Sequence, residues 1–187
     1  MMGEPESVRD GMLRAIPSLR AFAVSLTGNV DRADDLVQET LVRAMDNIDS
    51  FAVGTNLPAW LFTILRNLFR TEYRKRRREV EDVDGSYIES MKSQPEQHSR
   101  IDFKEFRAAL DMLPQDQREA LLLIGASGFS YEEAAAICNC AVGTVKSRVF
   151  RARARLSELL SIESSDEFGP DHATRAILGG TSRFGGR

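Results

Sequence analysis

The sequence predicts an all-α protein of two small helical domains that are joined by a flexible acidic linker. Apolar residues recur with the 3.6-residue period of amphipathic helices in residues 8–78 and again in residues 100–162. Residues 79–99 lie between these segments and show little apolar periodicity. They carry six acidic side chains against one lysine, together with a glycine and a proline, a composition typical of a flexible connection.

The N-terminal segment first predicts two helices. Pro17 can begin a helix that ends at Gly28, with a short helix before it. Asp31 is expected to be the N-cap of the next helix, because its side chain can accept a hydrogen bond from the first turn. The inner stripe of that helix comprises Ala33, Leu36, Val37, Thr40, Leu41, Ala44 and Ile48.

A third helix follows a polar loop of about residues 49–56, and Pro58 lies near its start. Its inner stripe comprises Leu61, Ile64, Leu65, Leu68 and Phe69. At 100° per residue, four arginines cluster on the opposite face, namely Arg66, Arg70, Arg74 and Arg77. We expect Trp60 to lie in the core or at an interface, and Phe51 is a candidate core anchor of the loop.

The C-terminal segment predicts a helix-turn-helix. One helix begins near Ile101, and Pro114 restarts the chain as a second helix. Residues 130–133, with the sequence SYEE, form a capping box that opens a short helix. Residues 138–140 make a turn, and a longer basic helix runs from about Val142 to Leu160.

The charge distribution indicates two sites for a polyanion. The net charge of −3 argues against a protein that coats nucleic acid. However, residues 58–78 contain seven basic side chains against one acid, and residues 142–155 contain five against none. Two basic blocks separated by an acidic stretch suggest that each domain contacts the polyanion separately.

Other classes of protein and site fit poorly. No apolar run approaches the ~20 residues that span a bilayer, and residues 1–11 lack the basic and apolar regions of a signal peptide, so we expect a cytoplasmic protein. Cys138 and Cys140 are too few for a disulfide framework and are distant from the two histidines, so no metal site is expected. We find no catalytic constellation and no phosphate loop, and expect neither an enzyme nor a cofactor.

Three consecutive segments resemble the extracytoplasmic-function sigma factors of RNA polymerase, in the order found in that family. DRADDLVQETLVRAMDNIDSF, residues 31–51, resembles the conserved helix of sigma domain 2, and residues 56–78 resemble its promoter-reading helix. Residues 113–156 are similar to sigma domain 4. The resemblance implies domain 2 in residues 8–78, the linker in 79–99, domain 4 in 100–162 and a flexible tail in 163–187.

The resemblance also implies partners and a regulation. The factor would bind core RNA polymerase and the −35 and −10 promoter elements, and would help to open the duplex. Residues 125–148 further resemble the subgroup of the general stress response, in which a soluble anti-sigma protein holds the factor inactive. In that subgroup a phosphorylated response regulator with a sigma-like domain removes the anti-sigma protein.

The site residues carried over by this resemblance fall into three sets. The polymerase-binding set is Asp34, Asp35, Gln38 and Glu39. The −10 set is Arg66, Asn67, Arg70, Arg74 and Arg77, and the loop of about residues 50–57 captures a flipped base in this family. The −35 set is Thr144, Lys146, Ser147, Arg148, Arg151 and Arg155. Within it, Arg148 is a candidate for reading guanine and Arg155 for holding phosphate.

Plainer interpretations stay open beside these. Each charged face can be a solvated surface, every arginine of the last helix can contact phosphate without reading bases, and the two cysteines can simply pack the turn. A stand-alone helix-turn-helix regulator would not explain the segments that resemble domain 2. A sigma-like decoy that sequesters an anti-sigma protein would carry a receiver domain, and no such β/α pattern exists in this sequence.

Overall fold

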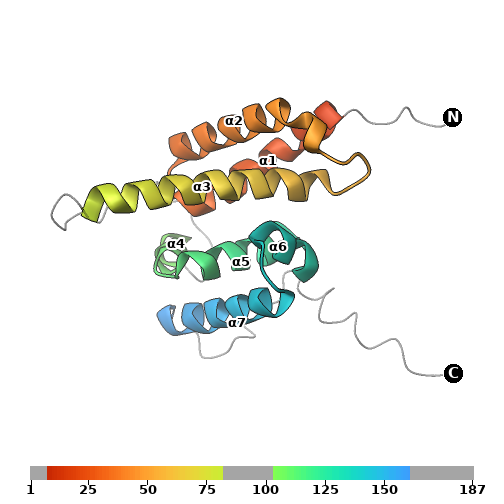
Figure 1. Ribbon diagram of the computed structural model, residues 1–187. Helices are drawn as coiled ribbons and strands as arrows, with labels where there is room; N and C mark the ends of the chain where they lie inside the picture. The colour runs from red at the N-terminus through yellow and green to blue at the C-terminus, as the bar shows by residue number, and fades with distance from the viewer. Residues whose placement is uncertain (1–7, 82–102, 161–187) are drawn as a thin grey trace, which may run out of the picture. The chain divides into compact units, whose positions relative to one another are not determined.

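The computed structural model describes residues 8–81 and 103–160, which form seven α-helices and one short 3-10 helix (Figure 1). No strand occurs among these residues, so the predicted all-α class is confirmed. The chain divides into two compact units.

The first unit is a three-helix arrangement of α1 (Val8–Thr27), α2 (Val30–Asp46) and α3 (Leu57–Glu81), in which each helix packs against the other two. Its core includes the fully buried side chains of Leu19, Leu36, Leu61, Phe62 and Leu65. Phe22 and Phe62 connect α1 to α3, with ring centroids 5.0 Å apart. Burial of each such side chain contributes about 1.5–3 kcal/mol, so packing rather than local propensity fixes these helices.

Helix α1 is a single helix, and the prediction of a separate short helix before Pro17 was wrong. Met12 and Ala15 are buried and extend the apolar stripe of α1 through the proline. A proline inside a helix costs about 3 kcal/mol because one backbone hydrogen bond is lost. Tertiary packing of the residues before Pro17 offsets this cost. The proline alone, as a local signal for a helix start, does not reveal this packing.

The connection from α1 to α2 also differs from the prediction. Gly28 adopts a φ of 69°, in the left-handed region that ends helices. Asn29, not Asp31, is the N-cap of α2, since its side-chain oxygen accepts a hydrogen bond of 2.9 Å from the backbone N–H of Arg32. Asp31 instead lies in the first turn, where its charge favours the positive end of the helix.

The loop between α2 and α3 begins with the 3-10 helix η1 (Ile48–Ser50). Helix α2 ends at Asp46, so Ile48 is exposed and the expected inner stripe stops at Ala44. Phe51 is buried, and its ring centroid lies 5.2 Å from that of Trp60 on α3. The loop is therefore anchored at its base by an aromatic pair, as expected for a core anchor.

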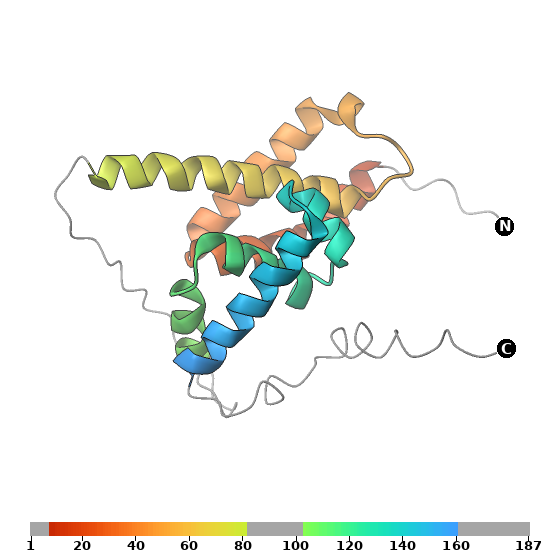
Figure 2. The ribbon, with the colours of Figure 1, turned by 60° about the horizontal axis from the view of Figure 1, so that its bottom comes forward.

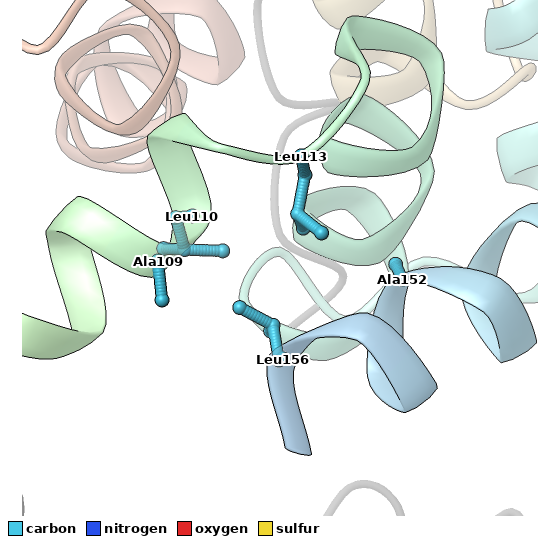
Figure 3. Close-up of a cluster of buried hydrophobic side chains, with 5 residues drawn as sticks. All are labelled: Ala109, Leu110, Leu113, Ala152 and Leu156. Carbon is cyan, nitrogen blue, oxygen red and sulfur yellow. The ribbon is translucent and has the colours of Figure 1, made fainter. Parts of the chain in front are cut away.

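The second unit contains α4 (Phe103–Asp111), α5 (Gln115–Gly125), α6 (Tyr131–Cys138) and α7 (Val142–Leu159). Figure 2 shows α7, in blue, beside α5 and α4, in green, and α7 packs against both. One buried cluster connects α4 and the turn after it to α7 (Figure 3). It consists of Ala109, Leu110, Leu113, Ala152 and Leu156.

The predicted capping box is confirmed at the start of α6. The backbone N–H of Glu133 donates to Ser130 Oγ at 3.1 Å, and the N–H of Ser130 donates to Glu133 Oε2 at 2.8 Å. Asn139 has a φ of 50° in the turn to α7, a conformation that asparagine tolerates better than most residues. The expected linker from residue 82 onward and the expected tail, residues 163–187, lie outside the described residues, while α3 continues to Glu81.

Candidate protein and nucleic-acid interfaces

The predicted acidic face lies on the outer side of α2. Asp35, Gln38 and Glu39 are exposed and follow one another at helical spacing. Asp34 is half-buried and is held by α1, because Arg20 donates from Nε to Oδ1 at 2.6 Å and from Nη2 to Oδ2 at 3.1 Å. Glu39 pairs with Arg43 one turn later, at 2.8 Å. Two of the three acids of this set are therefore engaged within the first unit.

The contact with Arg20 changes the titration of Asp34. The hydrogen bond from the guanidinium, and secondarily its positive charge, hold the pKa of the Asp34 carboxyl below its ordinary value. Desolvation acts in the opposite direction and is outweighed. Asp34 is accordingly ionised at any pH near neutrality, and its charge is already opposed by that of Arg20.

An apolar extension of the acidic face escaped the sequence reasoning. Val42 and Met45 are exposed and lie one and two turns beyond Gln38 on the same side of α2. The signal was available, because both residues fall outside the buried stripe that includes Val37, Thr40 and Ala44. The outer side of α2 thus combines an acidic half with an apolar half.

The basic side of α3 is only partly as predicted. Asn67 and Arg74 are exposed and Arg70 is half-buried, while the side chain of Arg77 lies outside the described residues. Arg66 lies closer to the apolar stripe of α3 than the helical wheel suggested. It follows Phe62 by one turn and precedes Phe69 by three residues, both of them buried, which places it at the border of the buried stripe.

Two hollows flank the loop between α2 and α3. One, of about 320 Å³, lies beside the end of α2 and is lined by Arg43, Asn47, Ser50, Trp60, Asn67 and Thr71, among others. The other, of about 440 Å³, lies between the loop and α1, with Phe51, Val53 and Asn56 in its wall. The first brings amides and hydroxyls, which can bind base edges, close to an aromatic ring, on which a base can stack.

The outer face of α7 carries the predicted −35 set, with unequal exposure. Arg151 and Lys146 are exposed, whereas Thr144 and Ser147 are half-buried. Lys146 Nζ lies 5.7 Å from the ring centroid of Tyr131, a cation–π distance that connects α7 to the start of α6. Arg155 is exposed and donates from Nη1 to Glu158 Oε2 at 2.8 Å, within the same helix.

Arg148 is less accessible than predicted. Its side chain is 20% exposed, and its Nε lies 2.9 Å from Asp116 Oδ2, in the first turn of α5. Its Nη1 donates to Cys140 Sγ at 3.6 Å. The arginine chosen as the base reader thus already bonds to two groups of its own unit.

Phe150 is a candidate that sequence reasoning missed. Its side chain is 74% exposed in the middle of α7, one turn after Ser147 and one turn before Ala154. An exposed aromatic flanked by arginines on a helix-turn-helix is suited to apolar contact with a thymine methyl group. The signal lay in the spacing, since Phe150 follows the buried Val149 and therefore cannot share its face.

Within residues 8–81 and 103–160, no group of three histidine, cysteine, aspartate or glutamate side chains is placed to hold a metal ion. None of the helices in these two segments is both long enough and apolar enough to cross a membrane.

Comparison with known proteins covers both units. Residues 12–79 match the family of sigma-70 region 2, and residues 103–156 match that of sigma-70 region 4. The ECF RNA polymerase sigma factor EcfG of Rhodopseudomonas palustris is 71% identical over 94% of this chain and 97% of its own. The ECF sigma factor SigM of Bacillus subtilis is 35% identical over 78% of this chain and 90% of its own.

A solved structure is similar along most of the chain. It is the sigma factor RpoE in complex with the anti-sigma factor NepR from Bartonella quintana, with 58% identity and a TM-score of 0.76. The match covers 83% of this chain and 98% of that one.

Proposed function

Since the chain belongs to the extracytoplasmic-function sigma factors of RNA polymerase, we propose that it directs core polymerase to stress promoters under the control of a soluble anti-sigma protein. The observation that carries this proposal is the pairing of a basic α3 in one compact unit with a basic α7 in the other. Each helix lies in a segment that matches a different sigma region. Such an initiation factor acts in the cytoplasm and performs no catalysis of its own.

Core polymerase binds the outer side of α2. The acids of this side suit a basic partner surface, and charge complementarity fixes the orientation of docking. Asp35 and Gln38 contribute to the interface directly, while Asp34 and Glu39 are oriented by Arg20 and Arg43. The exposed Val42 and Met45 add apolar area next to the charged half.

The −10 element is bound beside α3. Arg70 and Arg74 hold the phosphate backbone, since guanidinium groups form forked hydrogen bonds with phosphate. The hollow that contains Trp60 and Asn67 has the size and chemistry to accept an extruded base. Extrusion costs a few kcal/mol per base, and a protein site for the base offsets part of this cost during promoter opening.

The −35 element is bound by α7. In a helix-turn-helix the N-terminal residues of the second helix reach base edges, and here these include Ser147 and Arg148. Phe150 and Arg151 continue the same outer surface. Arg155 lies two turns after Arg148, where the helix leaves the groove, and is suited to phosphate.

The anti-sigma partner is supported by the solved relative, which is in complex with an anti-sigma factor and is 58% identical to this chain. Exposed apolar side chains occur in both units. They include Val42 on α2, Phe150 on α7, and Met112. A partner that covers such surfaces would block polymerase and promoter binding together.

The proposal is tested by transcription reconstituted from core polymerase, the purified chain and a panel of promoter templates. We expect initiation at a defined subset of promoters and none from core polymerase alone. Addition of a NepR-type protein should abolish initiation by this chain and leave that by an unrelated sigma factor intact. Initiation without promoter preference would contradict the sigma assignment, and intact initiation with the inhibitor would contradict the regulation.

A further inference from the structure

Arg148 is held from two sides by its own unit, and the more important contact comes from another helix. The carboxylate oxygen Oδ2 of Asp116, in the first turn of α5, lies 2.9 Å from Nε of Arg148 and forms an ion pair with it. The Sγ atom of Cys140, in the turn before α7, accepts from Nη1 at 3.6 Å. The side chains are 20% exposed for Arg148 and 39% for Asp116, so the pair lies at the edge of the unit and still reaches solvent.

This arrangement differs from that of the neighbouring arginines on α7. Arg155 pairs with Glu158 of the same helix, and both side chains are more than half exposed. That contact moves with α7 and fixes nothing relative to the rest of the unit. Asp116 belongs to α5, which packs directly against α7, so its carboxylate sets the position of the Arg148 guanidinium relative to the helix-turn-helix as a whole.

We propose that Asp116 is a positioning residue for −35 recognition, which orients Arg148 before DNA is bound. This inference rests on the proposed role of α7 at the −35 element. A guanidinium carries donors on Nε, Nη1 and Nη2 in one plane. Asp116 lies against Nε, and Cys140 accepts one hydrogen of Nη1, so the second hydrogen of Nη1 and both hydrogens of Nη2 stay available for the two acceptors that guanine presents in the major groove.

The advantage of this arrangement is pre-organisation. A free arginine loses rotamer freedom when it binds a base, and this ordering weakens binding by roughly two- to tenfold. In this protein Asp116 restricts the side chain before binding, so the loss has already occurred in the folded state. Asp116 also adds a negative charge close to DNA, which by itself weakens attraction to any phosphate backbone.

These two effects predict opposite signs when Asp116 is replaced. Asp116→Ala should reduce base preference at one −35 position by roughly two- to tenfold, because Arg148 is no longer oriented. The same change should strengthen sequence-independent DNA binding, because one negative charge is removed. A residue with a merely structural role would lower initiation at all promoters equally and would leave the ratios between them unchanged.

The experiment uses the full chain with core polymerase on templates that carry every single-base change in the −35 element, at several salt concentrations. Asp116→Ala, Asp116→Asn and Arg148→Ala are compared with Glu158→Ala, a matched control that removes the partner of Arg155. We expect Asp116→Ala to reduce base preference at the same −35 position as Arg148→Ala. The double variant Asp116→Ala with Arg148→Ala should reduce that preference no further than Arg148→Ala alone. Glu158→Ala should leave every ratio unchanged.

Each result decides the matter. If Asp116→Ala and Asp116→Asn retain full base preference while Arg148→Ala flattens it, Asp116 does not position Arg148. If Arg148→Ala lowers all templates equally, Arg148 is no base reader and the inference is overturned, although the sigma assignment stands. If the unaltered chain shows no promoter preference, the proposed function fails and this inference with it. Thermal unfolding of each variant shows whether a loss of initiation is due to misfolding. If Asp116→Ala is misfolded, the base preference of the milder variant Asp116→Asn tests the proposal instead.

Discussion

Replacement of Phe150 by alanine should separate apolar base reading from every electrostatic contribution of α7. The side chain is 74% exposed in the middle of the helix, so its removal should change the free energy of unfolding by no more than about 0.5 kcal/mol. If Phe150 contacts one thymine methyl group, the variant loses about 0.8 kcal/mol, the value of one buried methylene-sized group. At room temperature this corresponds to about a fourfold drop in initiation.

The assay is reconstituted transcription on pairs of templates that carry thymine or uracil at single −35 positions. Uracil lacks the methyl group and keeps the hydrogen-bonding edge, so unaltered protein should prefer thymine at one position and Phe150→Ala should show no such preference. The salt dependence should stay the same, because no charge is lost. Met112→Ala is the matched control, since this side chain is 62% exposed in the same unit and lies outside α7. An equal loss on thymine and uracil templates would refute the argument.

Four further predictions concern both units. Asp35→Arg should abolish capture of core polymerase without lowering the thermal midpoint. Asp34→Arg should lower the midpoint as well, because the new arginine repels Arg20. The double variant Arg20→Asp with Asp34→Arg should restore the midpoint, because it re-forms the ion pair with the charges exchanged. Because the pKa of Asp34 is depressed in the folded state, the stability that it contributes is present above the unfolded pKa of about 3.9 and is lost as pH falls through the folded value. Stability of Asp34→Asn and of unaltered protein, measured by urea unfolding, should therefore converge at low pH, and high salt should shrink the difference at neutral pH. The free chain should bind promoter DNA weakly at physiological salt, by fluorescence anisotropy, because its net charge is −3 and an acidic stretch separates its two basic blocks in the sequence. Arg155→Ala should weaken initiation at all promoters about equally and lower the salt slope by about one unit, and a loss confined to particular −35 bases would contradict a phosphate contact.

Periodicity predicted the helices well because most of them are amphipathic and their inner faces are decided by burial. The stripes through Leu36 and Leu65 are buried as the 3.6-residue period requires. Local start signals were less reliable, since packing of Met12 extends α1 through Pro17. Where several residues can cap a helix, the choice between Asn29 and Asp31 depends on backbone geometry that sequence does not contain.

The exposure of the candidate site residues was predictable for whole helix faces and not for individual side chains. A helical wheel divides a helix into inner and outer sides, but it cannot show which outer residue meets a partner from another helix. Arg148 and Asp116 are far apart in sequence, and only the packing of α5 on α7 brings them together. Phe150 is the opposite case, since its exposure follows from spacing alone: it is adjacent to the buried Val149 and lies off the apolar stripe of α7.

The two ion pairs on α2 bear on how this protein finds its polymerase. Long-range steering depends on the net charge of a surface, and it weakens within about 10 Å at moderate salt. Arg20 and Arg43 oppose two of the three acids of this face, so the field that reaches an approaching partner is much smaller than the sequence suggests. The encounter with polymerase should therefore be only mildly sensitive to ionic strength.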